Sequence, residues 1–346
     1  MEDRTRQEPI KSRFGAKTKA KEIVAGHDLK GKNVIVTGGY SGVGLEITKA
    51  LAGVGARVLV PVRNIEKAQA ALRGLPNVEM DTMDLMNPDS VDAFAERFLT
   101  TGKPLHLLIN DAGIMAPPLR RDSRGYESQF ATNHLGHFQL TARLWTALVK
   151  AKGARVVFVS SRAQRLGGVN FKDPNFLETE YQPMRAYAQS KSANVLCAVW
   201  LDKLGKDYGV RAFAAHPGLV PSTNLGSSSF YAQQSVIKRN IGKLMPGFMR
   251  ALHISSVINL LKKRKPHHIG DEFKSNKQGA ATPLWCAISH ELDGLGGVYC
   301  EDCNIAVTVQ DSSSPFGVLP WAIDEEQAER LWKLSEELTG VRFLME

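Results

Sequence analysis

The sequence predicts an α/β fold in which a doubly wound, seven-stranded parallel sheet is covered by helices on both faces. From residue 31 onwards, short runs rich in β-branched residues alternate with segments of helical periodicity. Strands joined through helices of about ten or more residues require right-handed crossovers, which give a parallel sheet. Two runs, LHLLIN (105–110) and RVVFVS (155–160), are almost continuously apolar, as expected for strands buried on both sides.

The order of these runs along the chain defines the elements of the sheet. The first two strands are followed by the helical segments GLEITKALAGVG (44–55) and IEKAQAALRG (65–74), and the last strand follows QGAATPLWCAIS (278–289). The seven predicted strands are NVIVT (33–37), RVLVPV (57–62), VEMDTM (78–83), LHLLIN (105–110), RVVFVS (155–160), VRAFAAH (210–216) and GGVY (296–299). No repeat or low-complexity linker interrupts the pattern, so we expect one domain over residues 31–346, preceded by a basic arm at 1–30.

A helical insertion is predicted at residues 228–277, near the C-terminal side of the chain. Its apolar residues recur at roughly helical spacing, and it carries the basic run KKRK at 262–265. These apolar residues are Ile241, Leu244, Met245, Phe248, Met249, Leu252, Val257, Ile258 and Leu261. We interpret the insertion as a lid over the substrate. Two alternatives stay open: a contact that covers the core or joins copies of the chain in a homo-oligomer, and a helix in peripheral contact with an anionic membrane.

Charge and composition exclude several classes of function. The net charge of +9 is concentrated in residues 1–32 and 238–277, which carry +4 and +8, whereas the remainder carries −3. Proteins that bind nucleic acid usually spread basic residues over a folded face, so we expect no nucleic-acid partner. No run of about 18 uncharged apolar residues and no secretory signal occurs, which predicts a soluble, cytoplasmic protein without stable membrane insertion.

The four cysteines, Cys197, Cys286, Cys300 and Cys303, include one CxxC pair. A zinc site needs a second pair of ligands with matching spacing, and the sequence offers none. We therefore expect no metal site and interpret the cysteines as reduced thiols with structural roles.

A glycine-rich turn follows the first strand directly. In TGGYSGVG (37–44), Gly38, Gly42 and Gly44 supply residues without Cβ at the start of a helix. Such a turn admits the pyrophosphate of a dinucleotide against backbone N–H groups at the helix N-terminus. A glycine triplet alone is weak evidence, but its place between the first strand and a helix predicts dinucleotide binding.

The end of the second strand selects between the two nicotinamide dinucleotides. An acidic residue there would bond the ribose 2′-hydroxyl, but the stretch VPVRN (60–64) has Arg63 and no carboxylate. A guanidinium can pair with a 2′-phosphate, so NADP(H) is favoured over NAD(H). The alternative interpretation of Arg63 is a solvated loop charge.

The stretch YAQSK (187–191) combines a phenol and an ammonium at helical spacing. Residues four apart on a helix share one face, so Tyr187 and Lys191 are expected to project together. A phenol with a reference pKa of ~10 is a poor acid at neutral pH, and a neighbouring ammonium is expected to lower that pKa. The spacing therefore indicates proton chemistry.

Five motifs taken together resemble the short-chain dehydrogenase/reductase family, whose fold is of the Rossmann type. They are TGxxxGxG at 37–44, NDAG at 110–113, a serine at the end of RVVFVSS (155–161), YxxxK at 187–191 and PG at 217–218, and the resemblance is close over residues 31–225. Within the family, NHLGHF (133–138), HPGLV (216–220) and DLKGK (28–32) are most similar to the branch of retinol dehydrogenases and WW-domain oxidoreductases, here expected without WW modules or a membrane anchor.

The resemblance implies four catalytic residues. Tyr187 would donate its proton to a carbonyl oxygen as hydride arrives, or remove it from an alcohol in the reverse direction. Ser161, which the family motif selects over Ser160, would hydrogen-bond the same oxygen. Lys191 would also bond the nicotinamide ribose, and Asn133 would anchor the water-linked proton relay of the lysine.

The resemblance also extends the cofactor site beyond the glycine-rich turn. Asp84 would lie beside the adenine, and Leu219 near the nicotinamide amide. The full implied set is Gly38, Tyr40, Ser41, Gly42, Val43, Gly44, Arg63, Asp84, Leu85, Asn110, Ala112, Gly113, Tyr187, Lys191, Pro217, Gly218, Leu219, Val220 and Thr223. Asp111 departs from the family, which usually has a second Asn or an Ala at this position.

The predicted function is that of an NADP(H)-dependent oxidoreductase that interconverts a hydrophobic ketone or aldehyde and its alcohol. Met115, the stretch around Phe230 and Tyr231, and the apolar face of 241–261 would form an apolar wall above the nicotinamide. The alternative is a non-catalytic scaffold or interaction protein that senses NADP(H). The complete catalytic set favours the enzyme, because a sensor needs neither the tyrosine nor the lysine. The sequence leaves the identity of the substrate open.

Overall fold

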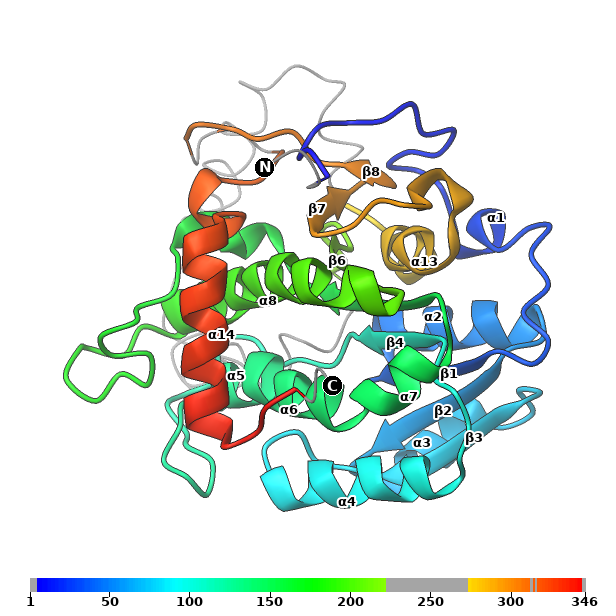
Figure 1. Cartoon of the computed structure of the whole chain (residues 1–346), viewed down its shortest axis with the longest axis horizontal. Helices are drawn as coiled ribbons and strands as arrows, with labels where there is room; N and C mark the ends of the chain where they lie inside the picture. Colours follow the sequence, from blue (N-terminus) through cyan, green and yellow to red (C-terminus); the bar gives the residue numbers. More distant parts are fainter. Residues whose placement is uncertain (1–4, 222–272, 312–313, 315, 344–346) are drawn as a thin grey trace, which may run out of the picture.

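The computed structural model describes residues 5–221, 273–311, 314 and 316–343. These residues form an eight-stranded sheet with the order β3-β2-β1-β4-β5-β6-β7-β8 (Figure 1). Neighbouring strands are parallel from β3 to β7. The chain winds outward from β1 in both directions, which is the doubly wound Rossmann-type topology. The predicted fold class is confirmed.

Seven of the strands match the predicted runs to within two residues at each end. The missed eighth strand, β8, pairs antiparallel with β7. Between them, Asp302 and Cys303 have φ values of +52° and +56°. Two consecutive left-handed residues form a tight hairpin turn of type I′, and this one lacks the glycine that normally signals it. The strands are β1 (Asn33–Thr37), β2 (Arg57–Val62), β3 (Val78–Thr82), β4 (Leu107–Asn110), β5 (Ala154–Val159), β6 (Val210–His216), β7 (Val298–Glu301) and β8 (Asn304–Ile305).

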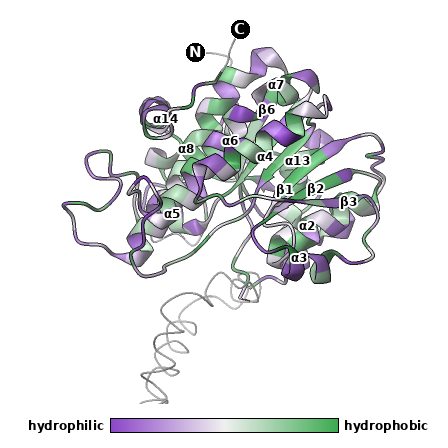
Figure 2. Ribbon diagram, turned by 90° about the horizontal axis from the view of Figure 1, so that it is seen from below, coloured by the Kyte–Doolittle hydropathy of each residue, from purple (hydrophilic) through white to green (hydrophobic). Residues whose placement is uncertain are grey.

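Helices cover both faces of the sheet, and each face has its own hydrophobic core. One face carries α1 (Ala20–Ile23), α2 (Gly42–Gly53), α3 (Ile65–Leu72) and α13 (Ala281–Ile288). The other face carries α4 (Pro88–Thr100), α6 (Gly136–Arg143), α7 (Trp145–Lys150), α8 (Pro183–Gly205) and α14 (Glu325–Thr339). Figure 2 shows α2 and α3 on one side of β1 and β2, and α6 on the other. The short helices are α5 (Ser128–Phe130), η1 (Ala131–Leu135), η2 (Arg162–Leu166), η3 (Lys206–Tyr208), α12 (Asn276–Gly279), η5 (His290–Leu292) and η6 (Pro320–Ala322).

Local sequence signals set the ends of these helices. The Asn87 side chain caps the first turn of α4, and Pro88 follows at the first helical position. Asp324 caps α14 by accepting from a backbone N–H in its first turn. The same helix ends at Gly340, whose φ of +68° is left-handed, as is common for glycine at a helix C-terminus.

The described part of the basic arm packs along the edge of the sheet. The Gln7 side chain donates to the carbonyl oxygens of Tyr299 and Ala306, both at 2.7 Å, and accepts from the Tyr299 N–H at 2.9 Å. Further along the arm, α1 buries Ala20 and Ile23 in the core of one sheet face. The arm is therefore tied to β7, β8 and the helices of that face.

The predicted insertion at 228–277 lies outside the described residues as far as position 272. Of the described remainder, Phe273 pairs with Leu219 in an isolated parallel bridge, and Ser275 caps α12. The interpretation of the insertion as a substrate lid stays a prediction.

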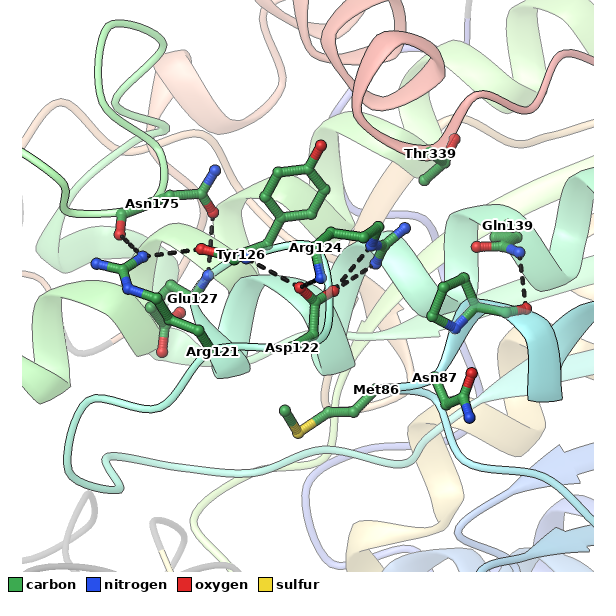
Figure 3. A network of polar contacts seen from close by, with 12 residues as sticks. Met86, Asn87, Arg121, Asp122, Arg124, Tyr126, Glu127, Gln139, Asn175 and Thr339 are labelled. Carbon is green, nitrogen blue, oxygen red and sulfur yellow. Dashed lines mark hydrogen bonds and ion pairs between the residues drawn. The ribbon is translucent and has the colours of Figure 1, made fainter.

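A network of polar contacts holds the loop before α8 against the segment that leads into η1 (Figure 3). Arg121 donates to the carbonyl oxygens of Asn175 at 2.8 Å and Phe176 at 3.0 Å. The Asn175 side chain in turn accepts from the N–H of the buried Glu127 at 3.0 Å. Glu127 caps α5, which continues into η1. The network therefore fixes the start of the helical segment that carries Asn133.

Candidate active site

The four residues predicted to be catalytic come from η1, the end of β5 and α8. Asn133 lies in η1, a five-residue π-helix that continues into α6. Ser161 follows β5 and caps η2. Tyr187 and Lys191 share one face of α8, near its N-terminus. Short π-helical stretches next to α-helices often mark functional sites.

Tyr187, Ser161 and Lys191 lie close together. The Tyr187 side chain is 5% exposed, and the Ser161 side chain interacts with its phenol. Lys191 Nζ lies 5.8 Å from the centre of the Tyr187 ring and donates to the carbonyl oxygen of Val159 at 2.8 Å. The neighbouring Ser160 instead donates to the Lys191 carbonyl oxygen at 2.7 Å. The structure thus places Ser161, and not Ser160, beside the phenol.

Burial dominates the protonation of the tyrosine and the lysine. It raises the pKa of the Tyr187 phenol to about 12, although the interaction with Ser161 opposes the rise. It lowers the pKa of the Lys191 ammonium to about 8, and the Asp111 carboxylate opposes that fall. The expected lowering of the Tyr187 pKa by Lys191 is wrong for this structure. The cost of burying a phenolate raises this pKa, the Asp111 charge adds to the rise, and Ser161 rather than Lys191 opposes it.

Asn133 forms hydrogen bonds through its side-chain amide and through its backbone carbonyl oxygen. Its amide accepts from the Ile114 N–H at 2.8 Å and donates to the Ile114 carbonyl oxygen at 2.9 Å and to Ser190 Oγ at 2.9 Å. A Cβ on Gly113 would stand 3.1 Å from Asn133 Oδ1 and 3.5 Å from Lys191 Nζ. The NDAG turn therefore lies between the asparagine and the lysine, and only a glycine fits there comfortably.

Thr37 and His137, which the sequence analysis did not single out, connect this turn to η1. The Thr37 hydroxyl accepts from the N–H groups of Asp111 and Ala112, both at 3.0 Å, and lies 2.9 Å from His137 Nε2. His137 Nδ1 lies 3.0 Å from the Asn133 carbonyl oxygen. Since a carbonyl oxygen only accepts, Nδ1 carries the proton and Nε2 accepts from Thr37. Burial lowers the pKa of His137 to about 4, so this neutral form prevails at pH 7.

The glycine-rich turn between β1 and α2 fits a dinucleotide. Gly38 and Gly42 have φ values of +69° and +54°, a region that favours glycine. A Cβ on Gly44 would stand 2.5 Å from the Gly38 carbonyl oxygen, and one on Gly38 3.0 Å from the Ala112 Cα. Ser41, the residue before α2, makes no side-chain capping bond. The backbone N–H groups of the first turn of α2 can therefore be approached closely by a pyrophosphate.

The remaining predicted cofactor residues lie at the carboxyl ends of the strands. Arg63 is exposed after β2, and no hydrogen bond or ion pair joins it to another described residue. The Asp84 carboxylate accepts from the Met86 N–H at 3.0 Å, and the buried Asn110 donates to Thr141 at 3.2 Å. The hydrophobic core of one sheet face includes contacts from Tyr40, Val43 and Val220, and Leu85 is buried after β3. The segment after β6 carries Pro217, Gly218 and Leu219, whereas Thr223 lies outside the described residues.

Part of the predicted apolar wall is described. Met115 packs against a small buried cluster that contains Tyr187 and Ala163. Leu219 and Phe273 are 38% and 57% exposed, although both are large and apolar. Phe230, Tyr231 and the face of 241–261 lie outside the described residues.

A cavity of about 660 Å³ lies against α8, but neither Tyr187 nor Lys191 lines it. Among its lining residues, Gln182, Arg185 and Gln189 recur every three or four positions, on the side of α8 opposite Tyr187. The other lining residues are Leu166, Gly167, Gly168, Val169, Asn170 and Met184. We do not assign the reacting substrate to this cavity, because neither Tyr187 nor Ser161 lines it.

Two polar side chains next to residues of the predicted site were missed by the sequence analysis. Arg162 directly follows Ser161, and its Nε has no hydrogen-bond partner among the described residues. His216, which precedes the PG motif, is 2% exposed, and neither of its ring nitrogens is paired within the described ranges. Burial, and next the charge of Arg162, hold the pKa of His216 well below its usual value. Only their place directly beside the serine and PG motifs could have signalled them.

The described residues contain no group of three or more His, Cys, Asp or Glu side chains placed to hold a metal ion. All four cysteines are buried and free. In the same ranges, no helix combines the length and the apolar character that crossing a membrane requires.

Comparison with known proteins decides the family. A family model described as short chain dehydrogenase matches residues 32–233. The chain belongs to the short-chain dehydrogenase/reductase family. It is therefore related to oxidoreductases that transfer hydride with a nicotinamide dinucleotide, NAD(P)(H), and the predicted resemblance is confirmed.

The curated relatives include both kinds of protein in the predicted branch. Retinol dehydrogenase 12 of Mus musculus is 34% identical, over 91% of this chain and 88% of the relative. A probable oxidoreductase of Streptomyces lividans is 37% identical, over 88% of this chain and 97% of that relative. The WW domain-containing oxidoreductase of Homo sapiens is 32% identical, over 99% of this chain and 76% of that relative. Among solved structures, an uncharacterized protein from Mycobacterium paratuberculosis is 30% identical with a TM-score of 0.68, over 93% of this chain and 98% of that chain.

Proposed function

We propose that this short-chain dehydrogenase/reductase is an NADP(H)-dependent enzyme that interconverts a hydrophobic ketone or aldehyde and its alcohol. The observation that carries the proposal is the contact between the Tyr187 phenol and Ser161, with Lys191 on the same helix face. These groups lie beside the NDAG turn, whose Ala112 packs against the glycine-rich turn of β1 and α2. A proton donor, an oxygen-orienting hydroxyl and a dinucleotide cradle thus occupy one site.

The proposed roles follow from the chemistry of each group. The bound dinucleotide supplies or accepts the hydride. Tyr187 donates the proton to the carbonyl oxygen, and Ser161 orients that oxygen by hydrogen bonding. Lys191 is a cation within 5.8 Å of the phenol, and it stabilises negative charge that develops there. Asn133 holds the NDAG turn through Ile114 and thereby positions the backbone next to the lysine.

The preference for NADP(H) rests on Arg63. It is exposed at the end of β2, where the adenosine ribose binds in this fold, and it has no partner among the described residues. A guanidinium that is not engaged elsewhere is suited to a 2′-phosphate.

The hydrophobic substrate class rests on Met115, Leu219 and Phe273. Met115 packs against Tyr187. The exposed Leu219 follows the strand end that carries the PG motif, and the exposed Phe273 pairs with it. The names of the retinol dehydrogenase relatives point to an apolar alcohol or aldehyde as well. Cytoplasmic location, a homo-oligomer and a lid at 228–277 stay predictions from the sequence.

A screen of carbonyl compounds with NADPH tests the proposal. We expect the absorbance of NADPH to fall with at least one apolar ketone or aldehyde, and small polar carbonyl compounds to react more slowly. If NADPH binds but no compound reacts, the alternative of a scaffold that senses NADP(H) gains support, and the enzyme proposal is wrong.

A further inference from the structure

Asp111 is a carboxylate at the centre of the proposed cofactor site, where the family usually has an amide or a methyl group. It follows β4, and its N–H is fixed by the Thr37 hydroxyl at 3.0 Å. Its side chain reaches across to the first turn of α2, since a Cβ on Gly44 would stand 2.6 Å from Asp111 Oδ2. Gly44 is the third residue of α2, and its N–H is one of the donors that a helix leaves unpaired.

The titratable groups around Asp111 come from two helices. Lys191 and Tyr187 face it from α8, and each interacts with its charge. His137 on α6 lies behind Thr37 and is neutral. Burial raises the pKa of Asp111 to about 7, although Lys191 and then the N–H of Gly44 favour its charged form. Near neutral pH the carboxyl group is therefore divided between its two protonation states.

We propose that Asp111 makes cofactor binding proton-linked: its carboxylate takes up a proton from solvent when the pyrophosphate of NADP(H) binds at the N-terminus of α2. The inference rests on the proposed function, because it needs the dinucleotide to occupy this cradle. The only covalent change is O–H bond formation at the carboxylate, and no electrons are exchanged with the cofactor.

The physical reason is that two anions would share one helix N-terminus. The positive end of α2 favours a single negative group, and the ionised Asp111 already lies beside Gly44. A pyrophosphate at the same turn repels the carboxylate and raises the pKa of Asp111 above its value in the free protein. The neutral carboxyl group then remains beside Lys191 and does not repel the phosphates.

The sign of the pH dependence follows from this shift. Well below pH 7 the carboxyl group is already protonated, so binding needs no proton and affinity is highest. As the pH rises through about 7, each binding event must take up a proton, and affinity falls by up to about tenfold per pH unit until the pKa of the complex is passed. Lys191 has a pKa of about 8, so its own proton uptake on cofactor binding occurs mainly above that pH. Between pH 6 and 7.5 the change in affinity therefore reports mainly on Asp111.

The first test is fluorescence titration of the full chain with NADPH at a series of pH values. For the unchanged protein we expect the dissociation constant to rise about three- to fivefold between pH 6 and 7.5. Asp111→Asn should make affinity nearly independent of pH in this range and tighter at pH 7.5. Asp84→Asn is the matched control, because it removes the other carboxylate of the predicted cofactor set but should keep the pH dependence. The 2′-phosphate of NADPH titrates equally for all three proteins, so differences between them report on the protein.

The second test is calorimetry of NADPH binding at pH 7 in two buffers with different ionisation enthalpies. We expect about half a proton to be taken up by the unchanged protein, and clearly less by Asp111→Asn. Binding without proton uptake, or the same pH dependence with Asn at position 111, overturns the inference and leaves the proposed function intact. Failure of NADPH to bind at any pH overturns both. The measurement on the unchanged protein decides the question even if Asp111→Asn does not fold.

Discussion

At the scale of single residues, the candidate site is built from buried polar groups whose protonation is set by their surroundings. The same burial that raises the pKa of Tyr187 lowers that of Lys191. The spacing YxxxK correctly predicted that both residues share one helix face. It led us to expect a lowered pKa for Tyr187, whereas the structure raises that pKa. Desolvation depends on what packs around a side chain, and the sequence does not contain that information directly.

Tyr187→Phe tests the proposed proton donor. The variant keeps the ring that packs against Ala163 and Met115 but loses the hydroxyl that contacts Ser161. We expect turnover to fall by at least about 10²-fold, the usual contribution of a positioned general acid, while NADPH binding persists. Steady-state kinetics and fluorescence titration measure the two effects. Turnover close to that of the unchanged protein would remove Tyr187 from the mechanism.

Arg63→Ala tests the choice of cofactor. Loss of a charge-assisted hydrogen bond to the 2′-phosphate should weaken NADPH binding by about 1–3 kcal/mol and leave NADH binding nearly unchanged. Arg63→Lys is the matched control, because it retains the charge without the paired donors and should give an intermediate loss. Equal losses for the two dinucleotides would show that Arg63 does not contact the 2′-phosphate.

At the scale of elements, the sites where two segments approach closely determine which residues are tolerated. The turn into α2 packs against the NDAG turn after β4, and this leaves no space for a Cβ at Gly44. The glycine pattern predicted access for a pyrophosphate at this turn, whereas its packing against the NDAG turn is shown only by the structure. The hairpin of β7 and β8 and the π-helix η1 were not predicted, because neither carries a distinctive local signal: the strand β8 has two residues, and η1 continues the helical pattern of α6.

Gly44→Ala tests the close approach within the cradle. Its Cβ would stand 2.5 Å from the Gly38 carbonyl oxygen and 2.6 Å from Asp111 Oδ2, so the backbone must shift. We expect a loss of about 1–3 kcal/mol in the free energy of unfolding, together with weaker NADPH binding. Gly53→Ala, in the last turn of the same helix, has nothing within 4 Å of its Cβ. That control should leave NADPH binding unchanged and stabilise the helix by up to about 1 kcal/mol. Similar effects of the two substitutions in denaturant unfolding would contradict the steric argument.

At the scale of the whole molecule, the last helix, α14, packs across the helix that carries Tyr187 and Lys191. Figure 1 shows α14 crossing α8, and the two helices pack together. His134 Nε2 in η1 lies 2.8 Å from Ser335 Oγ in α14, next to the residue predicted to be catalytic in η1. Trp332 in α14 packs at 4.9 Å from Phe138 and 4.5 Å from Phe343, measured between ring centres. The C-terminal helix therefore supports both helical segments that carry the site.

Trp332→Ala tests this support. The side chain is 5% exposed within an aromatic cluster, so its removal should lower the free energy of unfolding by about 3–5 kcal/mol. Lys333→Ala is the matched control on the exposed face, where the ion pair of Lys333 with Glu329 should contribute less than about 1 kcal/mol. Guanidinium unfolding measures both variants. A change below about 1 kcal/mol for Trp332→Ala would show that α14 is not part of the cooperative core.

The sequence by itself determined the family, seven of the strands, the glycine-rich turn between β1 and α2, and the pairing of Tyr187 with Lys191 on one helix face. These features depend on periodicity and on residues close together in the chain, where local geometry restricts the choice of amino acid. The tertiary structure alone decided the eighth strand, the link from Thr37 through His137 to Asn133, and the proximity of Asp111 to Gly44 and Lys191. These features bring together side chains that are distant in sequence. Burial then changes the pKa of each group according to neighbours that no local pattern specifies.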